Sequence, residues 1–522
     1  MSSRILAFIG IFLSWWILTA LVYHHTPSNF LRAESGWYLF LSHSDAAVQH
    51  NFEKDALTKS FGGHYAPLGF LAEFVTAKLA GTHAGFWKWR QISVLALLAT
   101  ILFLFARQSG RALAVSRLKA SICAVGVTAI LIFQTQMRDF VAWPFMILQL
   151  FWLLFSLLAL VSLLQMAQRP SEKIWAWLAA GSAYVSLHFL GLGIVTVGAT
   201  AATMAGIWWV LRRCHSANAS KIKAPLFSLI AIATLHAVVM LKFIRADTVA
   251  PSQGWQPISF LAASLGFISN FAFATLRTLF TTGQPTSDAW QITQDWPYGI
   301  AILLGFGFLL ACAFLRCLRE PTLRNQTRLI LQTFASISFL MMIALTAIRE
   351  WQAPSPHGFA DYLAGPRYLI PSTFALAGIW VELLFLVAAA PVFLAVFLTL
   401  GLGLCAVVGN LQFAAEVYPK LTPRSMISHE RAWQSIVAMA RECRSADLAI
   451  PDVPLGTLTQ EFYDWDLKLF EPLLRADLNL PDGTSLNMAP WTAFAGASPD
   501  EYRRQVPSLA EVRTRLQLET KN

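Results

Sequence analysis

Residues 141–164 read VAWPFMILQLFWLLFSLLALVSLL, an apolar run that contains no charged side chain. A helix needs about 20 consecutive apolar residues to cross the hydrocarbon core of a bilayer, and this run is long enough. Similar runs precede and follow it between residues 5 and 409. The sequence therefore predicts an all-α polytopic membrane protein.

The composition supports this fold class. Of the 522 residues, 56% are hydrophobic and 13% are charged, whereas an average soluble domain has about 25% charged residues. The mean hydropathy of +0.54 is too high for a cytosolic enzyme. The continuous apolar runs also exclude a transmembrane β-barrel, whose strands are alternating segments of about 10 residues. The six cysteines show no metal-ligand spacing, and no Gly-Lys dipeptide is present that could belong to a P-loop.

Eleven segments are predicted to span the membrane. They are residues 5–23, 91–106, 120–135, 141–164, 174–190, 191–211, 224–244, 298–315, 329–348, 369–389 and 391–409. Cytoplasmic loops are enriched in Lys and Arg. Four clusters of these residues lie in the short connections, at 107–119, 169–173, 212–223 and 316–328. With the N-terminus inside, all four clusters fall on the cytoplasmic side of the cell (inner) membrane.

This orientation sets the domain organisation. Residues 1–409 form the transmembrane domain, and its first extracytoplasmic loop covers residues 24–90. Residues 257–280 are interpreted as a re-entrant or interfacial helix on the outer side, because a true span there would move the 316–328 cluster outside. The tail at 410–522 is then extracytoplasmic. It is predicted to be a small polar domain with an amphipathic helix at 428–446, capped by Ser428.

Three short motifs carry a resemblance to a known family. Asp45 is an acidic residue soon after the first span, and residues 64–68 read HYAPL. Residues 365–371 read GPRYLIP at the start of a late span. In these motifs and in its general layout the chain resembles the GT-C superfamily of membrane glycosyltransferases, in particular the branch of the protein O-mannosyltransferases and the lipid A aminoarabinose transferases. It departs from that branch because Ser44 precedes Asp45, where the family has an adjacent acidic pair. The tail resembles no family.

The resemblance implies an enzyme that takes a sugar from a polyprenyl-phosphate carrier. The sugar would pass to a glycan, lipid or protein acceptor on the outer face of the membrane. A carboxylate near that face would act as general base. Asp45 is the first candidate for this role and Glu34 is the second. The structural alternative for Asp45 is an N-cap of a helix over residues 46–57.

The leaving phosphate would need basic side chains at the outer rim. Arg367 is the leading candidate, and Tyr368 beside it is either a substrate contact or an interfacial aromatic. His64 holds the family's position before Pro67, and its alternative role is a cap of the following helix. The other candidates at the outer ends of spans are Arg138, Lys242, Arg245 and Arg349. Their alternative role is to anchor the spans or to pair with a neighbouring carboxylate, as Arg138 would with Asp139.

No cofactor is expected. Six of the eleven histidines lie between residues 24 and 83, which makes a divalent metal conceivable. On one continuous helix, however, His43 and His50 would lie about 10 Å apart, too far to share an ion. The ligand spacing therefore does not support a metal site. The basic excess fits cytoplasmic loops and indicates no nucleic-acid partner.

Two other functions remain open on the sequence. One is a GT-C-like polymerase or ligase that moves whole oligosaccharides. The other is a membrane transporter or lipid flippase, which needs broken helices and charged side chains within the spans. Glu382 is the main charged residue inside a predicted span, and the rest of the charge lies at the span ends. This pattern favours surface chemistry on a lipid-borne sugar.

Overall fold

The structure is a computed structural model. It describes residues 3–60, 65–243, 296–350, 366–387, 391–417, 429–455, 465–481 and 483–490, together with Leu265 and Ile268. Within these ranges the chain is almost entirely helical, and one two-stranded sheet is present. The expectation of an all-α architecture is confirmed.

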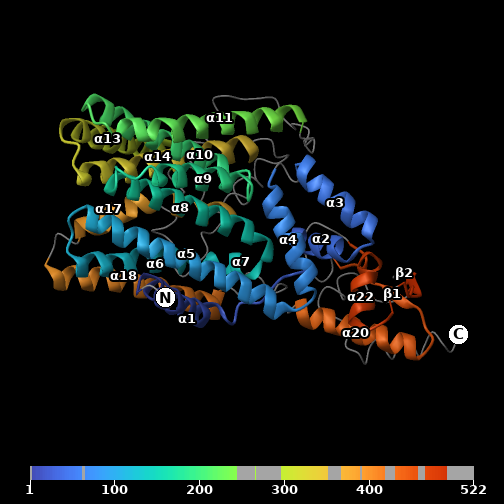
Figure 1. The fold of residues 1–522 in the computed structure, drawn as a ribbon. Coiled ribbons are helices and arrows are strands. Elements are labelled where there is room, and N and C mark those ends of the chain that lie inside the picture. Colours follow the sequence, from blue (N-terminus) through green and yellow to red (C-terminus); the bar gives the residue numbers. More distant parts are fainter. Residues whose placement is uncertain are drawn as a thin grey trace.

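A bundle of long helices forms the body of the molecule (Figure 1). Its members are α1 (Ser3–Tyr23), α5 (Ala84–Ala112), α6 (Arg117–Ile132), α8 (Ile147–Gln168), α9 (Ile174–Leu187), α10 (Gly193–Arg213), α11 (Ala219–Phe243), α13 (Trp296–Arg319), α14 (Leu323–Glu350), α16 (Pro366–Ala375), α17 (Ala377–Val387) and α18 (Val392–Gln412). In the part of the chain that the structure describes, eight helices are long and apolar enough to cross a membrane. The shorter α6, α9 and α16–α17 occupy three further predicted segments, so the count of eleven spans stays a prediction. The 257–280 segment lies outside the described residues, apart from Leu265 and Ile268.

The perimeter of the bundle exposes large apolar side chains. In the most apolar 18-residue stretch of α13, only 11% of the residues are buried, and the Phe308 side chain is 69% exposed. In α18 Phe393 is 81% exposed. Contiguous apolar surface of this extent is unfavourable in water and is covered by lipid in a bilayer. The outer helices therefore have the surface of a multi-pass membrane protein.

Small residues let the inner helices approach one another closely. Gly126 of α6 faces Thr399 of α18, and a Cβ at Gly126 would overlap the Thr399 side chain. Gly378 of α17 lies against the backbone of α14, where a Cβ would come within 2.6 Å of the Leu331 carbonyl oxygen. Close backbone approach at small residues is typical of helix packing in membranes, where packing contacts replace the hydrophobic effect.

Three helices lie across one end of the bundle (Figure 1). They are α2 (Ala33–His43), α3 (Ala46–Thr58) and α4 (Pro67–Ala80), and together they are called the end layer. All three belong to the predicted first loop. Beneath them lie the short α7 (Met137–Ala142) and η1 (Pro144–Met146). The first loop is therefore a folded layer of helices.

The C-terminal region packs on the end layer. It contains α20 (His429–Ser445), β1 (Ile450–Asp452), η5 (Leu467–Phe470), α22 (Glu471–Asp477) and β2 (Met488–Pro490), and β1 pairs with β2 in parallel. The Leu31 amide donates to His429 Nδ1 at 3.1 Å, and the Thr82 hydroxyl donates to Asp477 at 2.8 Å. α18 continues beyond residue 409 and is followed by η4 (Phe413–Val417), so the spanning helix extends past the predicted domain boundary. The first loop and the tail lie at the same end of the bundle.

The basic clusters lie at the opposite end. The α5–α6 and α13–α14 connections, which hold the clusters at 107–119 and 316–328, lie far from the end layer (Figure 1). Because α8 starts beside η1 and α9 ends against α4, the 169–173 connection between them also lies at that end. Charge is thus separated along the bundle axis. Which face of a membrane each end contacts stays a prediction.

Candidate functional site

Asp45 lies at the junction of α2 and α3 on the surface of the end layer. It is the N-cap of α3, and its Oδ1 accepts a hydrogen bond from the Val48 amide at 2.9 Å. The side chain is exposed. Within the described residues Oδ2 receives no hydrogen bond. The capping role is therefore shown, and it leaves one carboxylate oxygen available to a ligand.

Glu34, the second candidate base, lies in the first turn of α2 and is half-buried. It faces the same interior as Tyr38, which is 1% exposed. Burial raises the pKa of Tyr38 well above its ordinary value, and the nearby Glu73 and Glu34 carboxylates raise it further. Tyr38 is therefore a neutral phenol near two acidic side chains. Glu34 lies at the start of α2, and Asp45 lies just beyond its end.

A buried ion pair joins the end layer to the bundle. Arg90 of α5 donates to Glu73 of α4 at 2.6 Å, and Glu73 is fully buried. Arg90 also donates to the Pro144 carbonyl at 2.8 Å and lies over the Trp87 ring at 4.8 Å. Burial raises the pKa of Glu73, and the Arg90 guanidinium opposes that shift. Neither Arg90 nor Glu73 is among the site residues predicted from the sequence. The available signal was a lone carboxylate within the apolar helix at residues 67–80, because buried charges need partners.

A second ion pair corrects an expectation. Asp139 pairs with Arg32 of the first loop at 2.9 Å and not with the adjacent Arg138. Arg32 also lies over the Trp143 ring, 4.2 Å from its centroid. The reason is that Asp139 and Arg138 point in different directions from α7. Asp139 reaches the end layer, and Arg138 enters the bundle.

Arg138 is 3% exposed and its donors are used inside the protein. It donates to the Val22 carbonyl and the Thr26 hydroxyl at 3.0 Å each, and to the Asn410 carbonyl at 3.4 Å. It therefore ties α1 and α18 to α7. This environment differs from the exposed outer rim that the phosphate-binding interpretation assumed.

The remaining phosphate candidates are placed only in part. Lys242 is exposed near the end of α11. Arg367 and Tyr368 lie in the first turn of α16, and Arg349 lies in the last turn of α14, but their side chains are not among those described. His64 and Arg245 lie outside the described residues.

The start of α16 lies toward the end layer. Thr373, two turns into α16, hydrogen-bonds with Gln134 at 2.9 Å, just before α7. α16 also contacts α7 directly. The backbone of residues 366–368 is therefore at the same end of the bundle as Asp45 and Glu34.

An aromatic cluster joins the HYAPL motif to the bundle. The Tyr65 ring lies 5.7 Å from that of His236 in α11, and His236 lies 5.4 Å from His188. Tyr184 completes the cluster at 4.9 Å from His188. The Tyr65 hydroxyl donates to the Leu57 carbonyl at 3.0 Å. No local pattern could have predicted this cluster, because its members come from three segments that are far apart in the sequence.

The expectation that His43 and His50 could lie on one continuous helix is wrong. Ser44 ends α2, so His43 and His50 lie on two different helices and not on one. Burial lowers the pKa of His43. Within the described ranges, no group of three or more His, Cys, Asp or Glu side chains could hold a metal ion.

The structure therefore brings two predicted carboxylates and the start of α16 to one end of the bundle. A cavity of about 590 Å³ lies at the other end, between the α5–α6 connection, α13, α14 and α17, and no predicted site residue lines it. An exposed carboxylate in a helical layer above membrane spans can accept a proton from a substrate bound at the membrane surface. No family model, no curated protein and no solved structure matches the chain.

Proposed function

We propose that this protein is a membrane glycosyltransferase that uses a polyprenyl-phosphate sugar as donor. The reaction takes place at the end layer, on the extracytoplasmic side. The observation that carries the proposal is the position of Asp45 on the layer of helices that lies across one end of the bundle. Its carboxylate is exposed, and one of its oxygens receives no hydrogen bond from the described residues.

The chemistry requires a base and a stabilised leaving group. Asp45 accepts the proton of the acceptor hydroxyl or amine as that atom attacks the anomeric carbon. The bond between the anomeric carbon and the phosphate oxygen breaks, and the electron pair leaves with the polyprenyl phosphate. A glycosidic bond forms, and the proton remains on the carboxylate until solvent removes it.

The phosphate needs positive charge at the same end of the bundle. Arg367 is the proposed ligand, and the position of α16 supports this because its first turn lies toward the end layer. A planar guanidinium offers two parallel donors to phosphate oxygens. Tyr368 and His64 are proposed as neighbouring substrate contacts, and Lys242 and Arg349 as rim cations. Arg138 is not included, because its donors are used within the bundle.

The test is transfer by the purified full-length protein in lipid nanodiscs. Radiolabelled polyprenyl-phosphate sugars are supplied with an envelope extract as the source of acceptor. The proposal predicts protein-dependent loss of label from the lipid and its appearance in an acceptor. If none of a broad panel of donors is consumed, the glycosyltransferase proposal fails.

One observation favours the transporter or flippase alternative. Glu382 of α17 lies beside the large cavity at the basic end, where it accepts a hydrogen bond from Gln332 at 2.6 Å. A carboxylate within a span is typical of transport pathways. Reconstituted vesicles separate the two functions, because a flippase moves labelled lipid across the bilayer without changing its chemistry.

A further inference from the structure

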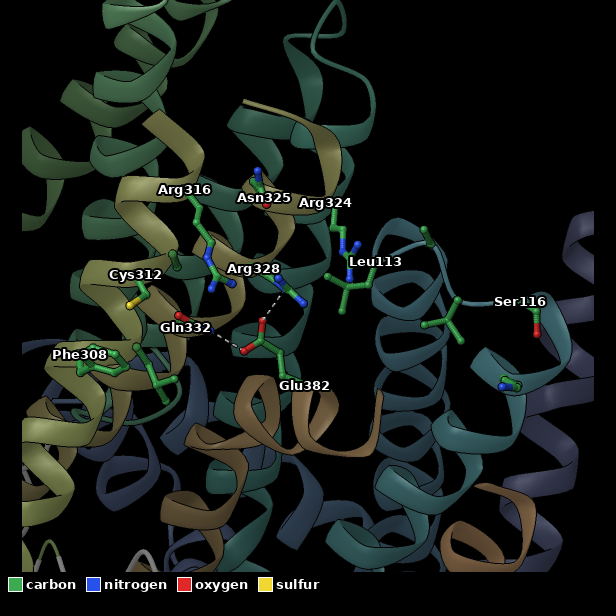
Figure 2. Close-up of a pocket in the computed structure, with 15 residues that line it drawn as sticks. Leu113, Ser116, Phe308, Cys312, Arg316, Arg324, Asn325, Arg328, Gln332 and Glu382 are labelled. Carbon is green, nitrogen blue, oxygen red and sulfur yellow. Dashed lines mark hydrogen bonds and ion pairs between the residues drawn. The ribbon is translucent and has the colours of Figure 1, made fainter. Parts of the chain in front are cut away.

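The large cavity lies at the basic end of the bundle and takes no part in the proposed reaction. Its volume of about 590 Å³ lies within the usual range of ligand pockets, about 300–1,000 Å³. The α5–α6 connection, α13, α14 and α17 form its walls (Figure 2). It contains residues of two of the basic clusters that the sequence analysis used only for orientation.

Positive charge dominates the polar wall. Arg316 of α13 and Arg324 and Arg328 of α14 converge on the space above Glu382 (Figure 2). Lys119 also lines the cavity, so four cations face a single carboxylate. Arg328 lies 4.0 Å from Glu382. The side chains of Arg316 and Arg324 make neither an ion pair nor a hydrogen bond with the part of the protein that is described. The wall therefore has an excess of positive charge that suits a phosphate group.

The floor of the cavity offers acceptors. Gln332 is only 7% exposed, and its Nε2 donates to Glu382 Oε2. Gln332 Oε1 is buried and receives no hydrogen bond from the described residues. Glu382 Oε1 is also buried without a hydrogen bond from them, and its described partner is Arg328 Nε, in the ion pair at 4.0 Å. Buried polar atoms are nearly always satisfied, so these two oxygens call for donor groups on a ligand. A hydroxyl-bearing group meets that need next to the phosphate.

One side of the cavity, formed by part of α13, is apolar and faces outward. Phe308 and Leu309 of α13 line the cavity, and they are 69% and 40% exposed. Both lie on a helix that is long and apolar enough to span a membrane and that buries little of its surface. The cavity therefore opens beside a surface that lipid chains would cover.

We propose that this cavity binds the headgroup of an anionic phospholipid that carries hydroxyl donors. The phosphate lies between Arg316 and Arg324, the hydroxyls reach Gln332 and Glu382, and the acyl chains run along Phe308 and Leu309. This site lies at the end of the molecule opposite Asp45, and it stands whether or not the chain is a glycosyltransferase.

The experiment measures binding of short-chain lipids to the purified full-length protein in a neutral detergent. Dioctanoyl phosphatidylglycerol combines the phosphate, the hydroxyls and the chains. Dioctanoyl phosphatidylcholine has a phosphate and no donor, and inorganic phosphate has no chains. We expect saturable binding of phosphatidylglycerol that is about tenfold or more tighter than that of either comparison ligand. If inorganic phosphate binds as tightly, the site serves a soluble anion and the lipid proposal is overturned.

Two variants with matched changes in charge test the location. Arg316→Gln with Arg324→Gln removes the two guanidinium groups without a described partner and should weaken phosphatidylglycerol binding about tenfold or more. Arg111→Gln with Arg319→Gln removes two exposed charges at the same end that do not line the cavity, and it should bind as the unchanged protein does. Equal weakening by both double variants would show non-specific attraction to the basic end and would overturn the site.

A third variant tests the floor of the cavity. Gln332→Met keeps the side-chain volume and removes both the acceptor Oε1 and the Nε2 donor to Glu382, so it should reduce the preference for phosphatidylglycerol over phosphatidylcholine. An unchanged preference would contradict the role of the hydroxyls. Only variants whose melting temperature matches that of the parent protein are compared. If a variant does not fold, the comparison of the three ligands on the unchanged protein still decides the proposal.

Discussion

Four arginines show how far one residue type can differ in its surroundings. Arg138 is buried and satisfied by carbonyl and hydroxyl oxygens, and Arg90 forms a buried pair with Glu73. Arg32 bridges the end layer to Asp139, and Arg316 faces a cavity. From the sequence, Arg138 was expected at the outer end of a span and Arg316 in a basic cluster between spans, and no role was predicted for Arg32 or Arg90. Their partners lie up to several hundred residues away, so the individual roles could not be predicted.

Arg138 yields a prediction about stability. Arg138→Met should lower the melting temperature in detergent by several degrees, because three buried oxygens lose their donor. Each buried polar group left unsatisfied costs about 1–3 kcal/mol. Lys242→Met is the control, because Lys242 is exposed and its change should stay within about 0.5 kcal/mol. Equal melting temperatures, with loss of donor lipid binding in Arg138→Met, would instead support its role as a phosphate ligand.

At the scale of elements, local signals predicted helix starts well. A helix is predicted over residues 428–446, and α20 begins at His429, although its predicted cap, Ser428, lies outside the described residues. A helix N-cap is one of the two roles predicted for Asp45, and Asp45 caps α3. Helix lengths were less predictable, because the predicted span at 91–106 is the apolar middle of α5, which runs from Ala84 to Ala112. Charged residues mark where a helix leaves the hydrocarbon region and not where the helix ends.

The contact between α4 and the bundle depends on a glycine. The Gly69 amide donates to the His188 carbonyl at 3.0 Å. A Cβ at this position would lie 2.7 Å from the Phe189 carbonyl oxygen and 2.9 Å from a Leu148 side-chain carbon. Gly69→Ala should therefore push α4 outward and destabilise the protein by about 1–3 kcal/mol, seen as a lower melting temperature.

Gly85→Ala provides the matched control for that substitution. A Cβ there would meet no atom within 4 Å, and Gly85 lies inside α5. Alanine should be neutral or stabilising by up to about 1 kcal/mol at such a position. A melting temperature for Gly69→Ala as high as that for Gly85→Ala would show that α4 does not approach the bundle so closely.

The contact between α20 and the first loop is predicted to depend on pH. His429 is 2% exposed and accepts a hydrogen bond from the Leu31 amide, so it must be neutral there. Burial lowers its pKa from 6.5 to about 3, and the Arg32 charge adds to this effect. The unfolded state therefore binds more protons between these values, and stability rises with pH in that range. The contribution is present above pH 6.5, and about 2 kcal/mol of it is lost between pH 7 and pH 5.

Limited proteolysis of the C-terminal region across this pH range measures the effect. Cleavage should accelerate as the pH falls from 7 to 5. His429→Asn keeps an acceptor near the Nδ1 position and cannot titrate, so its cleavage should depend less on pH. The same acid sensitivity in this variant would assign the effect to another group.

At the scale of the whole molecule, charge and surface chemistry are separated along the bundle. The end layer and the C-terminal region lie at one end, and the basic clusters and the large cavity lie at the other. Hydropathy and loop charge predict that the first loop and the tail lie on one side of the bilayer and the basic clusters on the other, and this topology stays a prediction. The packing of η5 and α22 on α2, and of His429 in α20 on Leu31 just before α2, could not be predicted, because it joins segments about 400 residues apart with no sequence signal in either.

Labelling with a membrane-impermeant thiol reagent in intact cells tests the orientation. The exposed Cys214 and Cys405 are first replaced by Ser. Ala47→Cys in α3 should then react from outside, and Ser171→Cys in the α8–α9 connection should react only after permeabilisation, since both positions are exposed. The reverse labelling pattern would show that the protein has the opposite orientation in the membrane. Reaction at both positions from outside would contradict the predicted topology.

Loss of sugar transfer on a single change at Asp45 is the most direct test of the proposed function. Asn caps a helix as well as Asp does but cannot accept a proton, so Asp45→Asn should fold normally. Its rate of transfer from a polyprenyl-phosphate sugar should fall by about 10² to 10⁴. Asp55→Asn on the same helix, where Asp55 pairs with Lys59 at the surface, should keep the parent rate. Full activity in Asp45→Asn with loss in Glu34→Gln would move the base to Glu34, and full activity in both variants would contradict the account.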